Sequence, residues 1–264
     1  MVSDDYSAEA QRIAAAFVAA RRDARGLCDY PGAMPGDLAK GYAVQDAAIA
    51  LSGRAIGGWK VGRANPPVDG VERLAGPVFA DHIVDANGEA PSMPIFADGF
   101  GAAEAEFLLR VGARPPAGKT HFSRDEAKAL IDAIHVGIEV ASSPFAGING
   151  HGAPVTVSDF GNNNGLVIGP AIPGWRDEGF EAWPVELGIN GAVAGRGQAA
   201  AMLDGTIGAA RFLFGALAAR GIALEPGQWI SSGAVTGVHP VKPGDAIEAR
   251  FDQRWRVACT IKAA

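Results

Sequence analysis

The chain has 264 residues, of which 48% are hydrophobic and 20% charged, and its formal net charge is −6. This length allows one large domain or two small ones with a substantial core, and the acidic balance argues against general nucleic-acid binding, which needs a basic face. The two cysteines, Cys28 and Cys259, form no CxxC pair and no disulfide framework. No apolar stretch approaches the length of a membrane span. We therefore expect a cytoplasmic protein that acts away from membranes.

The first part of the chain is predicted to be helical. Residues 7–22 place apolar side chains at helical spacing. A connector rich in glycine and proline follows over residues 23–40, and a second helix is expected over residues 42–51, closed by Gly53. This pattern divides the chain into a helical N-terminal segment, residues 1–54, and a β-rich domain, residues 55–264.

The first predicted strand, residues 55–62, carries a lysine inside an apolar run. Lys60 stands between Trp59 and Val61. It is either an edge-strand charge whose stem reaches toward water or a functional cation. The flanking glycines favour the second interpretation, because they let a ligand approach the backbone closely. The polar residues 63–76 that follow are expected to form a mobile loop over a site.

Three glutamates stand in apolar, strand-like runs in the middle of the chain. Glu104 and Glu106 are two residues apart, so on a strand their side chains leave by the same face; Glu139 lies in a second such run. Like charges repel, and a carboxylate among apolar groups is costly unless it is paired or metal-bound. A hard divalent cation, Mg²⁺ or Mn²⁺, would resolve both problems. The alternative is an outward-facing polar stripe on a half-solvated sheet, with an unrelated Glu139.

The remaining elements alternate between short strands and two helices. Ser123 and Glu126 have capping-box spacing, which predicts a helix over residues 124–134, and Asn190-Gly191 is the strongest hairpin signal in the chain. The other expected elements are strands over residues 75–84, 101–111, 134–140, 155–158, 166–168, 185–189, 192–194, 229–231, 246–251 and 256–261, and a helix over residues 204–220.

Many short strands with few helices predict a β-rich α+β fold, in which the helical N-terminal segment precedes one curled, mixed sheet. GxSxG, HExxH, P-loop and GxGxxG motifs are absent. Several short motifs nevertheless follow one another in a fixed order. They are residues 41–45 (GYAVQ), 56–62 (IGGWKVG), 104–106 (EAE), 138–139 (IE), 227–236 (GQWISSGAVT) and 240–245 (PVKPGD).

This ordered set, spread over about residues 8 to 262, resembles the 2-hydroxypentadienoate (2-keto-4-pentenoate) hydratase and 4-oxalocrotonate decarboxylase group of the fumarylacetoacetate hydrolase superfamily. The resemblance implies the β-rich fold of that superfamily. It also implies roles for seven residues: Glu104, Glu106 and Glu139 as ligands of Mg²⁺ or Mn²⁺, Lys60 and Asp81 as catalytic residues at the substrate, and Asp159 and Thr236 as nearby substrate-binding residues.

The sequence departs from the hydratase pattern in two places. Where hydratases usually have an acidic residue, a serine and an arginine after the third ligand, this chain has residues 142–144 (SSP), and where they usually show Asp-Asn it has Asp159-Phe160. Pro144 offers no hydrogen-bond donor, and Phe160 replaces an amide by an apolar ring. We therefore expect a bulkier or less polar substrate tail than the usual short dienoate.

The activity implied by the resemblance is that of a metal-dependent hydratase, a lyase that acts on a 2-hydroxydienoate or 2-oxo acid through a metal-stabilised enolate. Its alternatives are a decarboxylase or a carbon–carbon bond hydrolase of the same superfamily, or a binding protein that has kept the fold without turnover. We further expect a homo-oligomer that serves the catabolism of aromatic compounds and has a small 2-oxo acid as its partner.

Overall fold

The structure is a computed structural model that describes residues 4–86, 88–177 and 179–264. Its largest element is an eight-stranded mixed sheet. The strands are β1 (Ile56–Val68), β2 (Val71–Phe79), β3 (Ile83–Asp85), β5 (Phe100–Val111), β6 (Ile131–Ser143), β7 (Asn163–Ala171), β10 (Trp229–Ser231) and β11 (His239–Pro240). Their order is β2-β1-β10-β5-β6-β7-β3, and β11 pairs with β5 outside this path. The β1–β10 and β3–β7 pairs are parallel, and the others are antiparallel.

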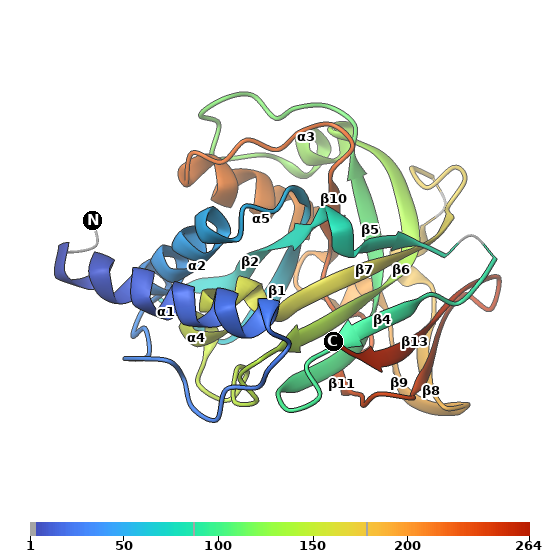
Figure 1. The fold of residues 1–264 in the computed structure, drawn as a ribbon. Helices are drawn as coiled ribbons and strands as arrows, with labels where there is room; N and C mark the ends of the chain where they lie inside the picture. Colours follow the sequence, from blue (N-terminus) through green and yellow to red (C-terminus); the bar gives the residue numbers. More distant parts are fainter. Residues whose placement is uncertain (1–3, 87, 178) are drawn as a thin grey trace.

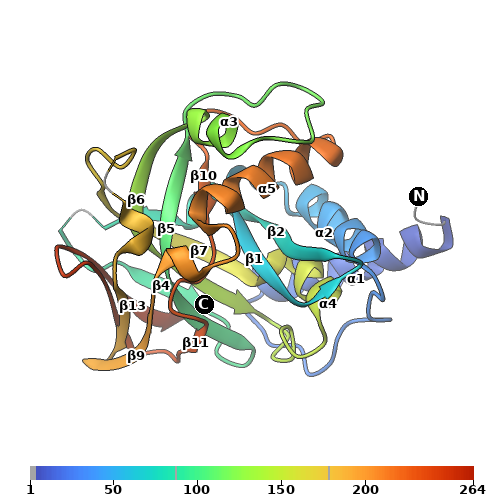
Figure 2. The ribbon, with the colours of Figure 1, turned by 180° about the vertical axis from the view of Figure 1, so that it is seen from behind.

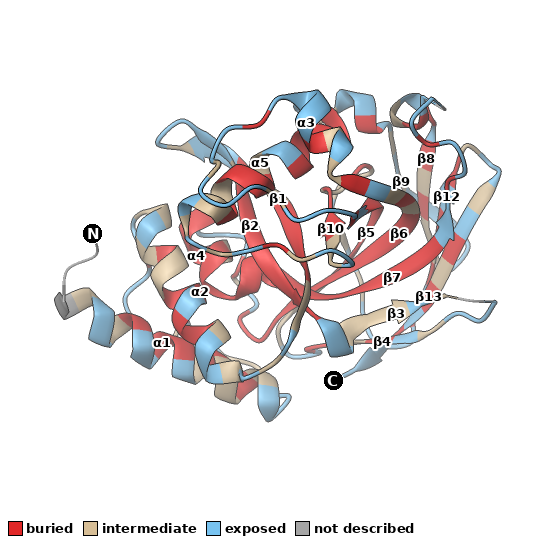
Figure 3. Ribbon diagram, turned by 90° about the horizontal axis from the view of Figure 1, so that it is seen from above, coloured by how far each residue is buried: buried red, intermediate tan, exposed pale blue. Residues whose placement is uncertain are grey.

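A second, five-stranded sheet packs against the first. It contains β4 (Ser92–Ile95), β8 (Val185–Ile189), β9 (Ala192–Gly197), β12 (Ala246–Phe251) and β13 (Trp255–Ala263). The strand order is β4-β13-β12-β8-β9. The main hydrophobic core lies where the two sheets meet: the ring of Phe107 in β5 stands edge-on to that of Phe251 in β12, with 5.1 Å between centroids. Figure 3 shows that β5, β6, β7 and β10 are largely buried.

Five α-helices and four 3₁₀ turns complete the described chain. The α-helices are α1 (Asp4–Arg22), α2 (Leu38–Ser52), α3 (Arg124–Ala129), α4 (Ala153–Ser158) and α5 (Gly205–Ala219), and the turns are η1 (Ala80–His82), η2 (Phe160–Asn162), η3 (Phe180–Ala182) and η4 (Ala199–Ala201). Figure 1 shows α1, α2 and α4 on one side of the molecule, and Figure 2 shows α5 near β1 and β2 with α3 beside it. None of the helices in the described ranges has the length and apolar character that a membrane span requires.

The N-terminal helices share a hydrophobic core with later parts of the chain. Phe17 of α1 and Val44 of α2 belong to one buried cluster together with Phe79, Phe145 and Phe160. Burying these side chains is favourable by about 1.5–3 kcal/mol each. The predicted helical segment is therefore held against the β-rich part by burial.

Four of the predicted elements differ from the structure. There are two sheets in the described chain where one was expected. Residues 63–76 are part of the β1–β2 hairpin, whose register shift between Arg63 and Val68 accommodates prolines in strand β1. The helix that begins after Ser123 ends at Ala129, because β6 starts at Ile131.

The fourth difference is α4, where a strand was predicted over residues 155–158. Gly152 precedes this helix with φ 85°, and Pro154 occupies its first turn, a position that proline favours because its missing N–H would have no partner there. These two residues outweigh the strand preference of the valines that follow.

Candidate metal centre and cavity

The register between β5 and β6 brings the three glutamates together. Glu104 stands directly opposite Glu139, and Glu106 stands opposite Gly137. Because alternate residues of a strand share a face, all three side chains project from one face of the sheet. They are buried, and one carboxylate oxygen from each lies within 4.8 Å of the others. The alternative of a polar stripe with an unrelated Glu139 is therefore wrong.

Lys60 joins this cluster from β1. Its Nζ lies 3.1 Å from Oε1 of Glu139, and its side chain is only 7% exposed. The strand β1 lies between β2 and β10, so it is not a sheet edge, and Lys60 pairs in register with Ser231 of β10. The alternative in which the lysine reaches from an edge strand into water is excluded by this burial.

Hydrogen bonds hold two of the carboxylates in place. Asn163 donates from Nδ2 to Oε1 of Glu139 at 3.0 Å. Oε2 of Glu106 accepts from the Ser231 hydroxyl and, at 2.8 Å, from the Gly233 amide. Oε1 of Glu106 is buried and has no hydrogen-bond partner. Buried polar atoms are nearly always satisfied, so this oxygen is a position where a further group would bind.

The electrostatics of the cluster favour a divalent cation. Burial raises the pKa of Glu104 to about 7 and that of Glu106 well above its usual value, and the neighbouring carboxylates oppose ionisation further. Burial alone would lower the pKa of Lys60, but the carboxylates of Glu139, Glu104 and Glu106 raise it above its usual value. If all three carboxylates are ionised, the single ammonium leaves two negative charges uncompensated. The residues present therefore fit Mg²⁺ or Mn²⁺, which prefer oxygen ligands.

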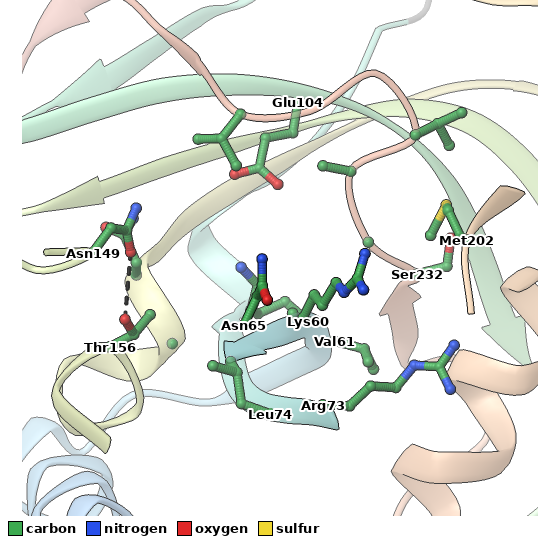
Figure 4. A pocket seen from close by; sticks show the side chains of 18 of the residues that line it. Lys60, Val61, Asn65, Arg73, Leu74, Glu104, Asn149, Thr156, Met202 and Ser232 are labelled. Atoms are coloured by element: carbon green, nitrogen blue, oxygen red, sulfur yellow. Dashed lines mark hydrogen bonds between the residues drawn. The ribbon is translucent and has the colours of Figure 1, made fainter. Parts of the chain in front are cut away.

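The cluster opens into a cavity of about 780 Å³, which Lys60 and Glu104 help to line. Figure 4 shows Glu104 pointing into it, with Asn65 and Leu74 across the cavity on β1 and β2. Three arginines also line the cavity: Arg63, Arg73 and Arg196. Arg73 pairs with Asp204 and Arg196 with Glu186.

Three other residues singled out from the sequence lie elsewhere. Asp81 is in η1, where its side chain is 63% exposed and pairs with Arg54. Asp159 is fully buried and pairs with Arg21 of α1, with 2.6 Å between Oδ1 and Nε. Thr236 follows the cavity-lining Val235, and its Oγ1 is buried without a hydrogen-bond partner. Asp81, Asp159 and Thr236 do not themselves line the cavity.

The two departures from the hydratase pattern also lie outside the cavity. The Phe160 ring packs edge-on against Phe79, with 5.0 Å between centroids, and its face meets the guanidinium of Arg21. Pro144 is buried as well. Neither residue contributes to the cavity wall. They therefore do not act on the cavity wall directly, and the expected preference for a bulkier or less polar substrate tail stays a prediction.

Sequence reasoning missed several polar residues at or near this site. Arg21 lies near the end of the helix expected over residues 7–22, and its partner Asp159 is 138 residues away, so no local pattern connects them. Asn162 lines the cavity, Asn163 hydrogen-bonds Glu139, and Ser231 contacts both Glu106 and Glu139. The run of three asparagines at 162–164 was the one available signal, since asparagine favours strained turns.

No family model and no curated protein matches this sequence. Solved structures do match. The chain superimposes on 4-oxalocrotonate decarboxylase from Pseudomonas putida G7, complexed with magnesium and adipate, with a TM-score of 0.81, 21% identity and 99% of both chains covered. A fumarylpyruvate hydrolase from Pseudomonas aeruginosa, in complex with Mn²⁺ and pyruvate, gives a TM-score of 0.57 at 16% identity over 78% of this chain and 89% of that one.

A third structure, 2-hydroxyhepta-2,4-diene-1,7-dioate isomerase from Mycobacterium marinum, gives a TM-score of 0.58 at 18% identity over 80% of this chain and 77% of that one. These neighbours are members of the fumarylacetoacetate hydrolase superfamily, and the α+β fold expected from the sequence is confirmed. The expectation of Mg²⁺ or Mn²⁺ is also supported, because two of these neighbours hold such ions and the buried glutamates here provide matching donors.

Proposed function

We propose that this chain is a divalent-metal-dependent lyase that acts on a 2-oxo acid or its 2-hydroxydienoate form, with hydration of the dienoate as its reaction. The observation that carries this proposal is the buried cluster of Glu104, Glu106 and Glu139, which opens beside Lys60 into a cavity large enough for a small organic acid. Such a cluster is costly to bury, and a function explains why the chain keeps it.

Glu104, Glu106 and Glu139 would hold the cation. When bound, a divalent cation supplies Lewis-acid stabilisation of the negative charge that develops on the 2-oxygen and carboxylate of such a substrate. Glu104 is the ligand that faces the cavity, so it defines the side from which the substrate enters. Glu106 and Glu139 are anchored by Ser231, Gly233 and Asn163, which fixes their orientation before any ligand arrives.

Lys60 is the residue of this chain best placed to act on the substrate. Its raised pKa keeps the ammonium protonated at neutral pH, so it can donate a hydrogen bond to negative charge that forms in the cavity. Hydration adds a water proton and hydroxide across the distal double bond, and Lys60 would stabilise the charge while that proton is transferred. A general acid or base typically contributes 10²- to 10⁴-fold.

A decarboxylase is the second candidate. The observation in its favour is the match to 4-oxalocrotonate decarboxylase over 99% of both chains. In that reaction a carbon–carbon bond breaks and CO₂ leaves. The electron pair of the broken bond remains on the organic acid. The same cation and the same lysine would stabilise that charge, so the two reactions make similar demands on the cluster.

The cavity wall favours a substrate with a second anionic group. Arg63 lines the cavity on β1, is exposed, and forms no ion pair within the described chain. Arg73 and Arg196 are paired with Asp204 and Glu186, so Arg63 carries the uncompensated positive charge on this wall. Because opposite charges at a cavity mouth attract a ligand and orient it, a carboxylate at the far end of the substrate is favoured over an apolar tail.

The test is a panel of 2-hydroxydienoates and 2-oxo-enedioates with and without Mg²⁺. Loss of dienoate ultraviolet absorbance without CO₂ release identifies a hydratase, and stoichiometric CO₂ identifies a decarboxylase. Lys60→Met should lower kcat/KM by about 100-fold or more without weakening Mg²⁺ binding, because it removes a positive charge next to the cation site. No turnover of any member of the panel by Mg²⁺-loaded protein would instead indicate a binding protein.

A further inference from the structure

Three consecutive residues beside the metal centre have left-handed backbone conformations. Phe160, Gly161 and Asn162 in η2 have φ values of 55°, 63° and 64°. A left-handed non-glycine residue costs of order 1–3 kcal/mol and persists only where the surroundings enforce it. Here both ends of the run are fixed, because Asp159 before it pairs with Arg21 and Asn163 after it donates to Glu139.

The side chain of Asn162 has no hydrogen-bond partner. It is 3% exposed, it lines the cavity, and its Oδ1 is buried without a partner. Buried carboxamides in folded proteins are nearly always satisfied, and an unsatisfied one costs about 1–3 kcal/mol. Nδ2 also makes no side-chain hydrogen bond within the described residues and, unlike Oδ1, is not fully buried, so it is the polar end that a ligand in the cavity can reach.

Asn162 also lies next to the groups that the proposed function uses. The preceding Gly161 is so close to Lys60 that a Cβ on it would lie 3.1 Å from Cδ of the lysine. The following Asn163 contacts Glu139. Lys60, Glu104 and Asn162 line one cavity. A small acid held against Glu104 and Lys60 therefore comes within reach of the Asn162 carboxamide.

We propose that Asn162 is a ligand-binding residue whose Nδ2 donates a hydrogen bond to an oxygen of an anionic ligand in this cavity. This inference rests on the proposed function, because the ligand is the 2-oxo acid. It explains why an asparagine occupies a position where glycine would be less strained: the side chain is kept for the hydrogen bond it donates.

The experiment measures oxalate binding to the Mg²⁺-loaded protein by calorimetry. Oxalate is a planar dianion that presents the same pair of adjacent oxygens as a 2-oxo acid in its enolate form. Asn162→Gly relieves the left-handed strain while it removes the amide, so it should keep or raise the thermal midpoint yet weaken oxalate binding about 10- to 100-fold. Asn162→Asp keeps the shape, removes both donors and adds a negative charge, so it should weaken oxalate binding more than glycine does.

Two controls separate ligand binding from other effects. Asp69→Gly relieves a comparable left-handed strain, φ 51°, at the exposed turn of the β1–β2 hairpin, and it should leave oxalate affinity unchanged. Mg²⁺ affinity, measured without oxalate, should be the same in wild type and Asn162→Gly.

Each contrary result overturns the inference in its own way. Wild-type oxalate affinity in Asn162→Gly would show that the asparagine serves only the turn. Undiminished affinity in Asn162→Asp would show that the amide does not act as a donor. An equal loss of Mg²⁺ affinity in Asn162→Gly would place its effect on the cation site. Failure of the wild-type protein to bind oxalate with Mg²⁺ would contradict the proposed function, and this inference with it.

Discussion

Two buried charge clusters lie close to each other in this protein, and they are built differently. In the first, the guanidinium of Arg21 donates to both oxygens of Asp159, at 2.6 and 2.8 Å, to the Asn164 side chain and to the Ser142 carbonyl. One positive and one negative charge cancel. In the second, three carboxylates share a single ammonium, and one oxygen of Glu106 has no partner.

The difference separates a structural role from a functional one. The Arg21 cluster is complete within the chain and ties α1 to β6, to β7 and to Asp159, the residue between α4 and η2. The glutamate cluster is incomplete. With its carboxylates ionised, two negative charges have no counter-charge, and Oε1 of Glu106 has no hydrogen-bond partner within the described residues. A buried cluster whose charges do not balance is a candidate site for a bound ion. A buried cluster whose charges balance is more simply explained as a contribution to the stability of the fold.

The largest expected effect is on cation binding, and it comes from removing one carboxylate of the glutamate cluster. Glu106→Gln removes one negative charge with little change of shape, and unit charges about 4 Å apart interact by about 4 kcal/mol at an effective dielectric constant near 20. We therefore expect Mg²⁺ affinity, measured by calorimetry, to fall on the order of 1,000-fold. Glu72→Gln, at an exposed position of β2, is the control. Undiminished Mg²⁺ binding by Glu106→Gln would remove the cation site from these residues.

Breaking the complete cluster should affect stability and not metal binding. Arg21→Met leaves Asp159 buried without its partner, which costs about 3–5 kcal/mol and should lower the thermal midpoint by about 6–20 °C. The neighbouring Arg22, whose side chain is 74% exposed, supplies the matched control Arg22→Met, which should melt within about 2 °C of wild type. If the midpoint of Arg21→Met also stays near that of wild type, the Arg21–Asp159 ion pair contributes little to the stability of the protein.

The glutamate cluster should also make the stability of the protein depend on pH. Because the folded pKa of Glu104 is raised to about 7 by burial, the folded protein holds a proton that the unfolded chain releases above about pH 4.3. The stability of the metal-free protein therefore falls as pH rises from about 4.3 through 7.

A bound divalent cation takes over the role of those protons. At 100 times its dissociation constant, Mg²⁺ should stabilise the protein by about 2.7 kcal/mol at pH 8, or about 5–10 °C in thermal midpoint. At pH 5.5 the same concentration should have much less effect, because protons compete for the carboxylates. Thermal melts at the two pH values make the comparison. An equal metal-induced shift at both would contradict the ionisation of these glutamates on binding.

The smallest effect is expected from a substitution of Asp81, which forms an ion pair with Arg54 on the surface of the protein. Exposed ion pairs are worth about 0–1 kcal/mol, and Asp81 lies away from the cavity wall. Asp81→Asn should keep kcat/KM within about twofold and shift the midpoint by less than about 4 °C. A loss of 100-fold or more in kcat/KM would support the catalytic role at the substrate that the sequence resemblance implies for this residue.

Part of the candidate metal centre could be predicted from the sequence because its signals are local. The two-residue period of a strand puts Glu104 and Glu106 on one face whatever the rest of the chain does. The apolar runs around Lys60 and Glu139 single these charges out, but by themselves they leave open whether each is buried with a partner or reaches water. The Asn190-Gly191 hairpin is present as well, since two residues alone set the conformation of its turn.

The rest depends on which distant segments pair. That Glu139 faces Glu104 follows from the register of β5 against β6, and the burial of Lys60 follows from the position of β1 between β2 and β10. Asp81 carries the same charge as Asp159, but the fold exposes one and buries the other against Arg21. Charge and strand period are properties of neighbouring residues, and the sequence determines them. Burial, strand register and partner choice arise only when segments far apart in the chain pack together, so the tertiary structure decides them.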